Sequence, residues 1–225
     1  MIDTDFKFDE LPNTNAALWC GPDLDSGELA CLVQVAVENK TSVLSVAPAS
    51  VGVVWPWLEG AAIKIMARFY FPDKKITEQQ VSDITVRINT AFKHGAHGAQ
   101  VFLDGVGALS DLVRQTHMIR DDLFFAKDLA IGLDIGGVGP TDWDGLFADL
   151  RKINASSLVL VMARDMGAKS DFAARVFGML DAWTNENKFD LHFVLGNNPM
   201  RIEQVMRLVQ KMRPELMMGL RFFVY

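Results

Sequence analysis

The sequence predicts an α/β protein built as a barrel of eight parallel strands. Between Ile63 and Gly136, three short apolar runs are separated by two helical patterns, and each run is followed within two residues by proline or glycine. Two of these runs end on an aspartate. Short apolar runs that alternate with helices are typical of parallel strands buried on both faces. Eight such runs can be placed along the chain, and this count favours a (β/α)8 TIM barrel over an open sheet.

In the first half of the chain, turn residues stop each apolar run, and capping residues begin the helices that follow. Asp25 or Ser26 can cap the first helix, and Thr77 with Gln80 forms a capping box. The leucines and valines of the first helix recur at the spacing of one helical face. The expected strands are 15–20, 41–47, 63–71 and 99–104, and the expected helices are 25–39 and 77–95.

The second half repeats the pattern. Thr141 and Asp144 can cap the fifth helix, Ser170 and Asp171 can open the sixth, and Pro199 suits the first turn of the last. No helical pattern follows the eighth strand, so the usual final helix is expected to be missing. The remaining strands are expected at 129–134, 158–163, 191–195 and 220–225, with a helix at 110–126.

An eighth strand without its helix would expose apolar side chains. The polar N-terminal segment or a second subunit could cover them, and a homo-oligomer through this C-terminal strand region is slightly favoured. We expect one domain over residues 1–225, with residues 1–14 as a polar N-terminal extension.

Composition and charge exclude several classes of partner. The net charge of −6 comes without a basic stripe, which argues against nucleic acid. No apolar run is long enough to span a bilayer, and the first residues lack the pattern of a signal peptide, so cytoplasmic residence is expected. Cys20 and Cys31 are interpreted as reduced core thiols. The expected partner is a small-molecule substrate.

Four segments resemble the deoxyribose-phosphate aldolase family of class I aldolases. Residues 22–51 follow that family's path from strand one into a strand that ends in proline, and residues 69–72 (Phe-Tyr-Phe-Pro) resemble its Gly-Phe-Pro strand end. Residues 91–96 resemble its Ala-x-x-x-Gly-Ala helix exit, and residues 129–136 occupy the place of its Lys-Val-Ile-x-Glu-Thr-Gly strand. The resemblance implies a TIM barrel and a lyase acting on a small carbonyl or sugar-phosphate-like substrate.

The departures from this family fall on its catalytic residues. The family forms a Schiff base with a lysine in strand six, whereas residues 158–164 contain no lysine. Its second lysine, in strand seven, would fall within 191–195, where none is present, and its strand-four aspartate corresponds to Gln100. The resemblance therefore implies that the fold is kept and that the known active site is not.

Three aspartates are candidate catalytic residues. Asp104, Asp134 and Asp165 lie at or just after the ends of strands four, five and six, so a barrel would bring them to one rim. Carboxylates gathered there could share a proton or bind a divalent metal such as Mg²⁺. Each could equally cap a loop or helix. No spacing specifies a metal, and no cofactor is required.

Basic and amide side chains are candidate substrate ligands. Lys64 and Arg68 are four residues apart in strand three and point to the same side, so both could face the barrel interior. Lys64 could be a relocated Schiff-base nucleophile or the partner of a carboxylate such as Asp134, and Arg68 could bind an anion. The same role is assigned to Arg164, Asn197 and Asn198, although the asparagines could simply cap a helix.

Three functions remain open. The first is an aldolase-like lyase, in which an aspartate acts as acid or base. The second is a catalytically degenerate barrel that serves as a binding or assembly subunit. The third is a metal-assisted lyase or hydrolase that uses the rim aspartates. An enzyme needs these aspartates to converge on an open mouth, whereas an assembly subunit is expected to have a filled one.

Overall fold

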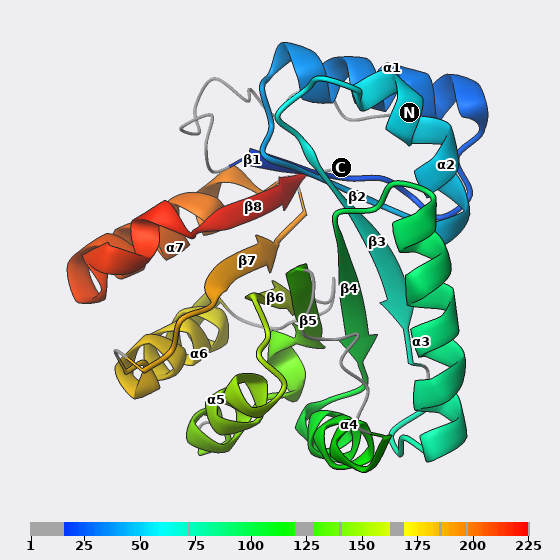
Figure 1. Ribbon diagram of the computed structural model, residues 1–225. Coiled ribbons are helices and arrows are strands. Elements are labelled where there is room, and N and C mark those ends of the chain that lie inside the picture. Colours follow the sequence, from blue (N-terminus) through cyan, green and yellow to red (C-terminus); the bar gives the residue numbers. More distant parts are fainter. Residues whose placement is uncertain are drawn as a thin grey trace.

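The eight strands pair in sequence order and close into a parallel barrel, with β1 hydrogen-bonded to β8 (Figure 1). The computed structural model describes residues 16–71, 73–119, 128–139, 141–162, 169–184, 186–196 and 198–224. The strands are β1 (Ala16–Trp19), β2 (Val43–Val46), β3 (Lys64–Tyr70), β4 (Gly98–Leu103), β5 (Asp128–Asp134), β6 (Ser157–Val161), β7 (Asp190–Val194) and β8 (Arg221–Val224).

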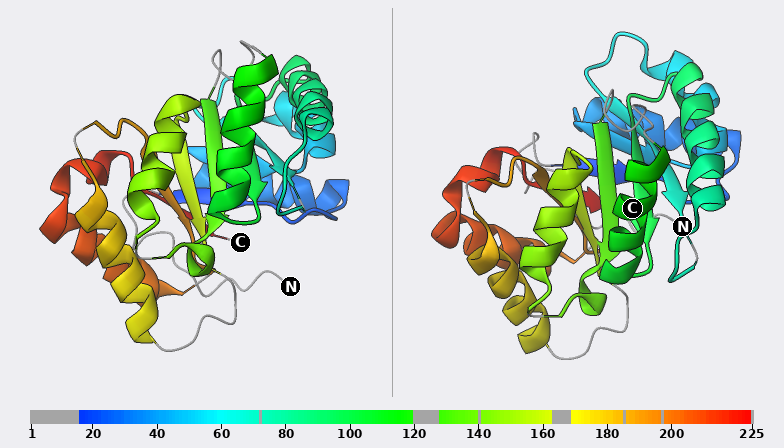
Figure 2. Two further views of the ribbon diagram at one scale, coloured as in Figure 1. Left: turned by 90° about the horizontal axis from the view of Figure 1, so that it is seen from below. Right: turned by 60° about the horizontal axis from the view of Figure 1, so that its bottom comes forward.

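Helices surround the strands on the outside (Figure 2). In the described ranges no helix follows β8, which confirms the predicted fold class and its missing final helix. The α-helices are α1 (Ser26–Glu38), α2 (Val51–Val54), α3 (Glu78–Lys93), α4 (Val106–Ile119), α5 (Trp143–Lys152), α6 (Lys169–Ala182) and α7 (Pro199–Met212). The 3-10 helices are η3 (Pro48–Ser50), η4 (Trp55–Leu58), η6 (Ile135–Gly137) and η7 (Pro214–Met218).

Local capping explains where the predicted helix starts are right and where they are wrong. Asp25, one of the two caps predicted for α1, forms a capping box with Glu28, and Thr77 forms the predicted capping box with Gln80. The fourth helix begins at Val106 rather than Ser110, because Gly105 adopts φ +93° and turns the chain straight out of β4. The cap of α5 is Asp142, not Thr141 or Asp144.

The described part of α6 begins at Lys169, and Ser170 and Asp171, which were predicted to open this helix, follow directly. Serine and aspartate favour both caps and first turns, and their presence alone therefore locates a helix start only to within a few residues.

The apolar core has two parts, one on each side of the strands. Alternate residues of each strand point into the barrel or toward the helices. The outer part packs the strands against the helices, and Phe222 and Val224 of β8 belong to it. The inner part fills the barrel with Ala17, Val43, Met66, Phe102, Ala130, Val159, Val194 and Phe223.

The eighth strand is well covered within the single chain. Phe222, Phe223 and Val224 are each 1% exposed, so burying them needs no second subunit. The largest exposed apolar side chain just before β8 is Met218 of η7, at 86% exposure. A homo-oligomer through this region stays a prediction, and Met218 of η7 is an exposed apolar side chain that such a contact could use.

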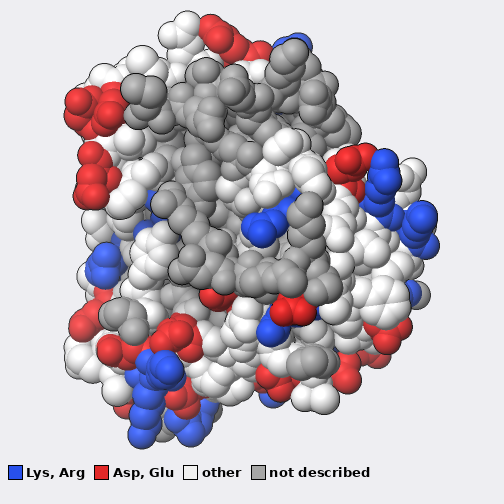
Figure 3. Space-filling model, turned by 180° about the vertical axis from the view of Figure 1, so that it is seen from behind, with Lys and Arg blue, Asp and Glu red and all other residues white. Residues whose placement is uncertain are grey.

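No helix within the described ranges has the length and apolar character needed to cross a bilayer. On the face seen in Figure 3, acidic and basic side chains of described residues are intermixed around the margin and form no continuous basic stripe.

Candidate functional site: the barrel mouth

Aromatic rings form a floor across the carboxyl-terminal mouth of the barrel. Trp19 packs edge-to-face against Phe102 and Phe223, with ring centroids 5.3 and 5.6 Å away. Tyr70 stacks on Phe102 at 5.2 Å and is itself 54% exposed. The Phe102 ring lies over Gly132 of β5, where an added Cβ would overlap it. The floor therefore depends on a glycine on the neighbouring strand.

A buried polar layer lies on the inner side of this floor. Arg68 is 3% exposed, and its Cζ lies 3.9 Å from the Trp19 ring centroid. Its Nη1 donates a hydrogen bond to Ser45 Oγ at 3.3 Å, and its Nη2 donates to the carbonyl oxygen of Cys20. Ser45 Oγ in turn donates to Gln100 Oε1 at 2.5 Å. Arg68 therefore ties β1, β2 and β3 together.

The Cys20 thiol and the Gln100 amide show what chemistry this region can support. Burial raises the pKa of the Cys20 thiol to about 12, and this effect exceeds the lowering by the positive charge of Arg68. Cys20 is thus a neutral thiol at physiological pH and a poor nucleophile. Gln100 Nε2 is buried and has no hydrogen-bond partner in the described structure. An orphaned buried donor is costly, so this amide is a point where a ligand or water could bind.

The rim carries two of the three predicted aspartates. Leu103 of β4 pairs with Leu133 of β5, so Asp104 and Asp134, the next residue in each chain segment, lie at the ends of adjacent strands. Both are exposed. Asp134 Oδ1 accepts a hydrogen bond of 2.8 Å from the Gly136 backbone N–H and so caps η6. Its predicted capping role is therefore real, and it leaves the second carboxylate oxygen available.

The remaining predicted ligands are only partly placed. Asp165, Arg164 and Asn197 lie outside the described residues. Asn198 is the N-cap of α7 and accepts a hydrogen bond from the Arg201 backbone N–H at 3.2 Å, as the capping alternative predicted. Among the described residues, no group of three His, Cys, Asp or Glu side chains is arranged to hold a metal ion. The structure thus brings together Asp104 and Asp134, with Arg68 buried beside the floor.

Lys64 lies at the opposite, amino-terminal end of the barrel. It is the first residue of β3, and its Nζ pairs with Asp128 Oδ2 at 2.5 Å, so its carboxylate partner is Asp128 rather than Asp134. Its side chain is 59% exposed. A lysine in this position is neither desolvated nor close to the mouth, so nothing favours it as a Schiff-base nucleophile.

Sequence reasoning missed the charged layer at this end. Burial raises the pKa of Asp190, opposed by the charges of Arg221 and Lys64. Burial also lowers the pKa of His192 to about 3, and its Nδ1 has no hydrogen-bond partner in the described structure. Alternate residues of a strand face inward, so Val194 at the mouth implies that His192 and Asp190 also face the barrel interior. This alternation could have identified both side chains from the sequence.

Comparisons with known proteins agree with this fold. No family model and no curated protein matches the sequence. Among solved structures, a protein from Toxoplasma gondii assigned as a deoxyribose-phosphate aldolase superposes with a TM-score of 0.70 at 16% identity, over 94% of this chain and 88% of the other. The deoxyribose phosphate aldolase of Aeropyrum pernix gives 0.64 at 13% identity, over 95% and 85%. The chain therefore has the barrel fold of the deoxyribose-phosphate aldolases.

Proposed function

We propose that this protein is an aldolase-fold barrel that binds a small polyhydroxylated or carbonyl compound at its mouth without forming a Schiff base. The observation that carries the proposal is the aromatic floor of Trp19, Phe102 and Phe223, which fills the barrel where a reactive lysine would need space. Lys64 is the one lysine among the described strand residues, and it faces the other end.

The inner faces of β6 and β7 support the same conclusion. Near the mouth they present Val159, Val161 and Val194. An aldolase of class I needs an amine there, next to groups that move protons. Valine side chains supply neither function, and they make the inner wall apolar.

The chemistry of the rim suggests the class of ligand. Tyr70 is 54% exposed at the mouth, where an aromatic side chain can contact an apolar sugar face or a planar group. Asp104 and Asp134 offer carboxylate oxygens that accept hydrogen bonds from hydroxyl groups. Together these groups suit a small polar molecule with one apolar face.

Reductive trapping tests the absence of Schiff-base chemistry. The protein is incubated with acetaldehyde, glyceraldehyde or deoxyribose 5-phosphate, treated with borohydride, and measured by intact mass. We expect no stoichiometric adduct. A single adduct that maps to one lysine would overturn the proposal.

Ligand-observed NMR with a panel of sugars and small hydroxyketones tests binding itself. Tyr70→Ala is expected to weaken binding about 10-fold, because it removes the stacking face. Tyr70→Phe keeps the ring and is expected to bind as the parent does. Equal binding by all three proteins would show that the mouth is not the site.

An acid–base lyase is the second candidate, and the adjacency of Asp104 and Asp134 favours it. Such an enzyme would exchange the α-protons of dihydroxyacetone in D₂O, and Asp104→Asn should then slow exchange by roughly 10²-fold or more. Adding MgCl₂ or EDTA to the same assay tests the metal-assisted alternative. Exchange at the rate of buffer alone, with and without Mg²⁺, would remove both forms of catalysis.

A further inference from the structure

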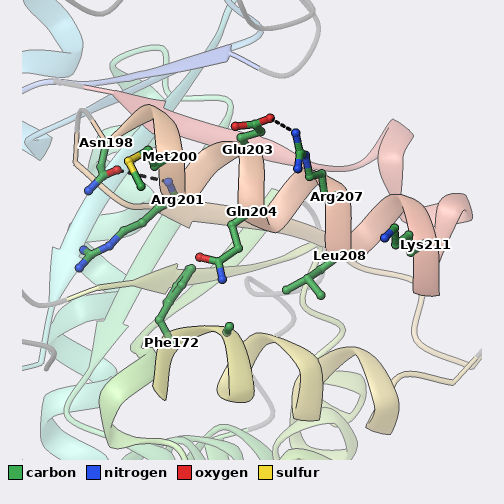
Figure 4. Close-up of a pocket in the computed structure, with 10 residues that line it drawn as sticks. Phe172, Asn198, Met200, Arg201, Glu203, Gln204, Arg207, Leu208 and Lys211 are labelled. Carbon is green, nitrogen blue, oxygen red and sulfur yellow. Dashed lines mark hydrogen bonds and ion pairs between the residues drawn. The ribbon is translucent and has the colours of Figure 1, made fainter. Parts of the chain in front are cut away.

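A groove outside the barrel, between α6 and α7, has two chemically different walls. Its cavity volume is about 510 Å³. Phe172 and Ala173 of α6 form an apolar wall, and the α7 side carries cationic and amide side chains (Figure 4). The groove therefore offers an amphipathic surface of the size of a small organic ligand.

The α7 wall follows from the spacing of its residues. Arg201, Gln204, Leu208 and Lys211 are separated by three, four and three residues, so they lie along one face of the helix. Gln204 and Leu208 point toward α6 between the two cations (Figure 4). Arg201 and Lys211 are ten residues apart, which places them ~15 Å apart along the helix axis.

The charge of the groove is opposite in sign to that of the chain. The protein carries a net charge of −6, yet the cavity is lined by Arg201, Arg207 and Lys211 and by one carboxylate, Glu203. Glu203 is already engaged, because its Oε1 accepts a hydrogen bond of 2.5 Å from Arg207 Nη2. Arg201 and Lys211 form no ion pair with a described residue.

Arg201 is the best placed of these cations to hold an anion. Its side chain is half-buried, and its Cζ lies 5.9 Å from the Phe172 ring centroid, so the guanidinium lies at the border between the two walls. It is in the first turn of α7, where the helix dipole also favours negative charge. A guanidinium binds carboxylate and phosphate oxygens through two parallel hydrogen bonds.

We propose that this groove binds an amphipathic organic anion. The anionic head lies on the Arg201 guanidinium, and the apolar body lies along Phe172, Ala173 and Leu208 toward Lys211. The head can be a carboxylate or a phosphate ester, since both present the same oxygen geometry. This site is separate from the barrel mouth and independent of the function proposed for it.

Displacement of 8-anilinonaphthalene-1-sulfonate provides the test, because this aromatic sulfonate fluoresces when it leaves water for an apolar site. Octanoate and octyl phosphate are the competitors, and comparing them separates a carboxylate head from a phosphate head. Inorganic phosphate and octanol, which are only head or only body, are expected to compete at least 10-fold more weakly, since each makes half of the contacts. Equal competition by octanol and octanoate would show that the cations take no part.

Variants that remove a positive or a negative charge from the groove should change its affinity for the anion in opposite directions. Arg201→Gln should weaken binding about 10-fold, because it removes a charge-assisted hydrogen bond. Glu203→Gln should strengthen binding by about 3-fold, because it frees Arg207. Glu78→Gln, in the first turn of α3, makes the same change of charge elsewhere and should leave binding unchanged.

A second pair of variants separates the groove from general charge. Lys211→Gln should weaken binding by about 3-fold, whereas Lys93→Gln, in the last turn of α3, should have no effect. Ala173→Phe fills the groove without changing charge and should abolish binding, while thermal melts report whether the fold is kept. If Arg201→Gln and Lys93→Gln bind alike, the proposal is wrong, whatever Ala173→Phe does.

Discussion

The contacts of a single inward-facing side chain in this barrel depend on which residue lies opposite it on the neighbouring strand. Arg68 faces inward with Met66, as its spacing from Lys64 predicted, and Gln100 lies opposite Arg68 on β4. The ladder register therefore brings Ser45, Arg68 and Gln100 into one hydrogen-bonded layer. The close fit extends to Gly132, where only a hydrogen atom leaves room for the Phe102 ring.

Gly132→Ala is expected to destabilise the protein by about 1–3 kcal/mol, because the new methyl group overlaps the Phe102 ring. Urea unfolding measures the change. Gly107→Ala is the matched control, since its Cβ meets no atom, and it should be neutral or stabilising. The double variant Gly132→Ala with Phe102→Leu should recover part of the loss, and no recovery would mean that the ring is not the obstacle.

His192 should make the protein less stable in acid. Burial lowers its pKa to about 3 in the folded state, so the unfolded chain binds the proton first as pH falls below the ordinary value of 6.5. Stability is then fully present above pH 6.5 and is lost toward pH 3, at about 1.4 kcal/mol per pH unit. The raised pKa of Asp190 acts in the opposite direction, which makes the observed slope shallower.

The comparison of His192→Leu with the parent isolates this contribution. Urea unfolding of both proteins between pH 4 and 7 should give a stability difference that changes with pH in favour of the variant as acidity rises. His94→Leu, at the exposed C-cap of α3, serves as the control. A difference that stays constant with pH would show that His192 is not desolvated in the folded state.

Three helices of this chain, α1, α3 and α7, begin where a side chain accepts a hydrogen bond from a backbone N–H of the first turn. The capping box of α3 was predicted because Thr77 and Gln80 lie three residues apart in the sequence, whereas for α1 only the cap at Asp25 or Ser26 was predicted. The start of α5 was not, because Asp142 makes no side-chain cap hydrogen bond and instead accepts one from the Gly139 backbone N–H. Local spacing thus predicts a helix start only where the cap itself is local.

Asp25→Ala is expected to cost about 1 kcal/mol, because it leaves the Glu28 backbone N–H without its acceptor, now at 2.9 Å. Asp25→Asn retains an acceptor oxygen and should lower the free energy of unfolding by only about 0.3 kcal/mol. Thermal or urea unfolding of the two variants measures the difference. Equal losses would point to the charge of Asp25, acting on the helix dipole, as the source of its effect.

Closure is the property that belongs to the molecule as a whole. Seven of the eight strand pairs join neighbours in the sequence, while β1 with β8 joins its two ends. Deleting residues 222–225 removes that pair and exposes two strand edges, so cooperative unfolding should be lost in calorimetry and urea titrations. Met218→Ser, at an exposed position just before β8, should keep a single sharp transition. A sharp transition in the truncated chain would mean that closure adds little.

The fold could be predicted much further than the site. Period and turn residues identified all eight strands, because each strand is buried on both faces and reads as an apolar run. The Lys64–Asp128 pair and the Arg68 bond to the Cys20 carbonyl were out of reach, since both depend on register between strands distant in the sequence. Asp104 and Asp134 were predicted as neighbours, but whether they act in catalysis depends on a ligand that no spacing names.

The pairing of β1 with β8 has a consequence during synthesis. Ala16 pairs with Phe222, so β1 can pair with β8 only after a further 206 residues have been synthesised. At ribosomal rates of 5–20 residues per second, one edge of β1 stays without its partner for about 10–40 s. An open strand edge invites pairing with another nascent chain. Because β1 has only four residues, it can form few backbone hydrogen bonds with such a chain. Its short length can therefore protect the protein from aggregation during synthesis.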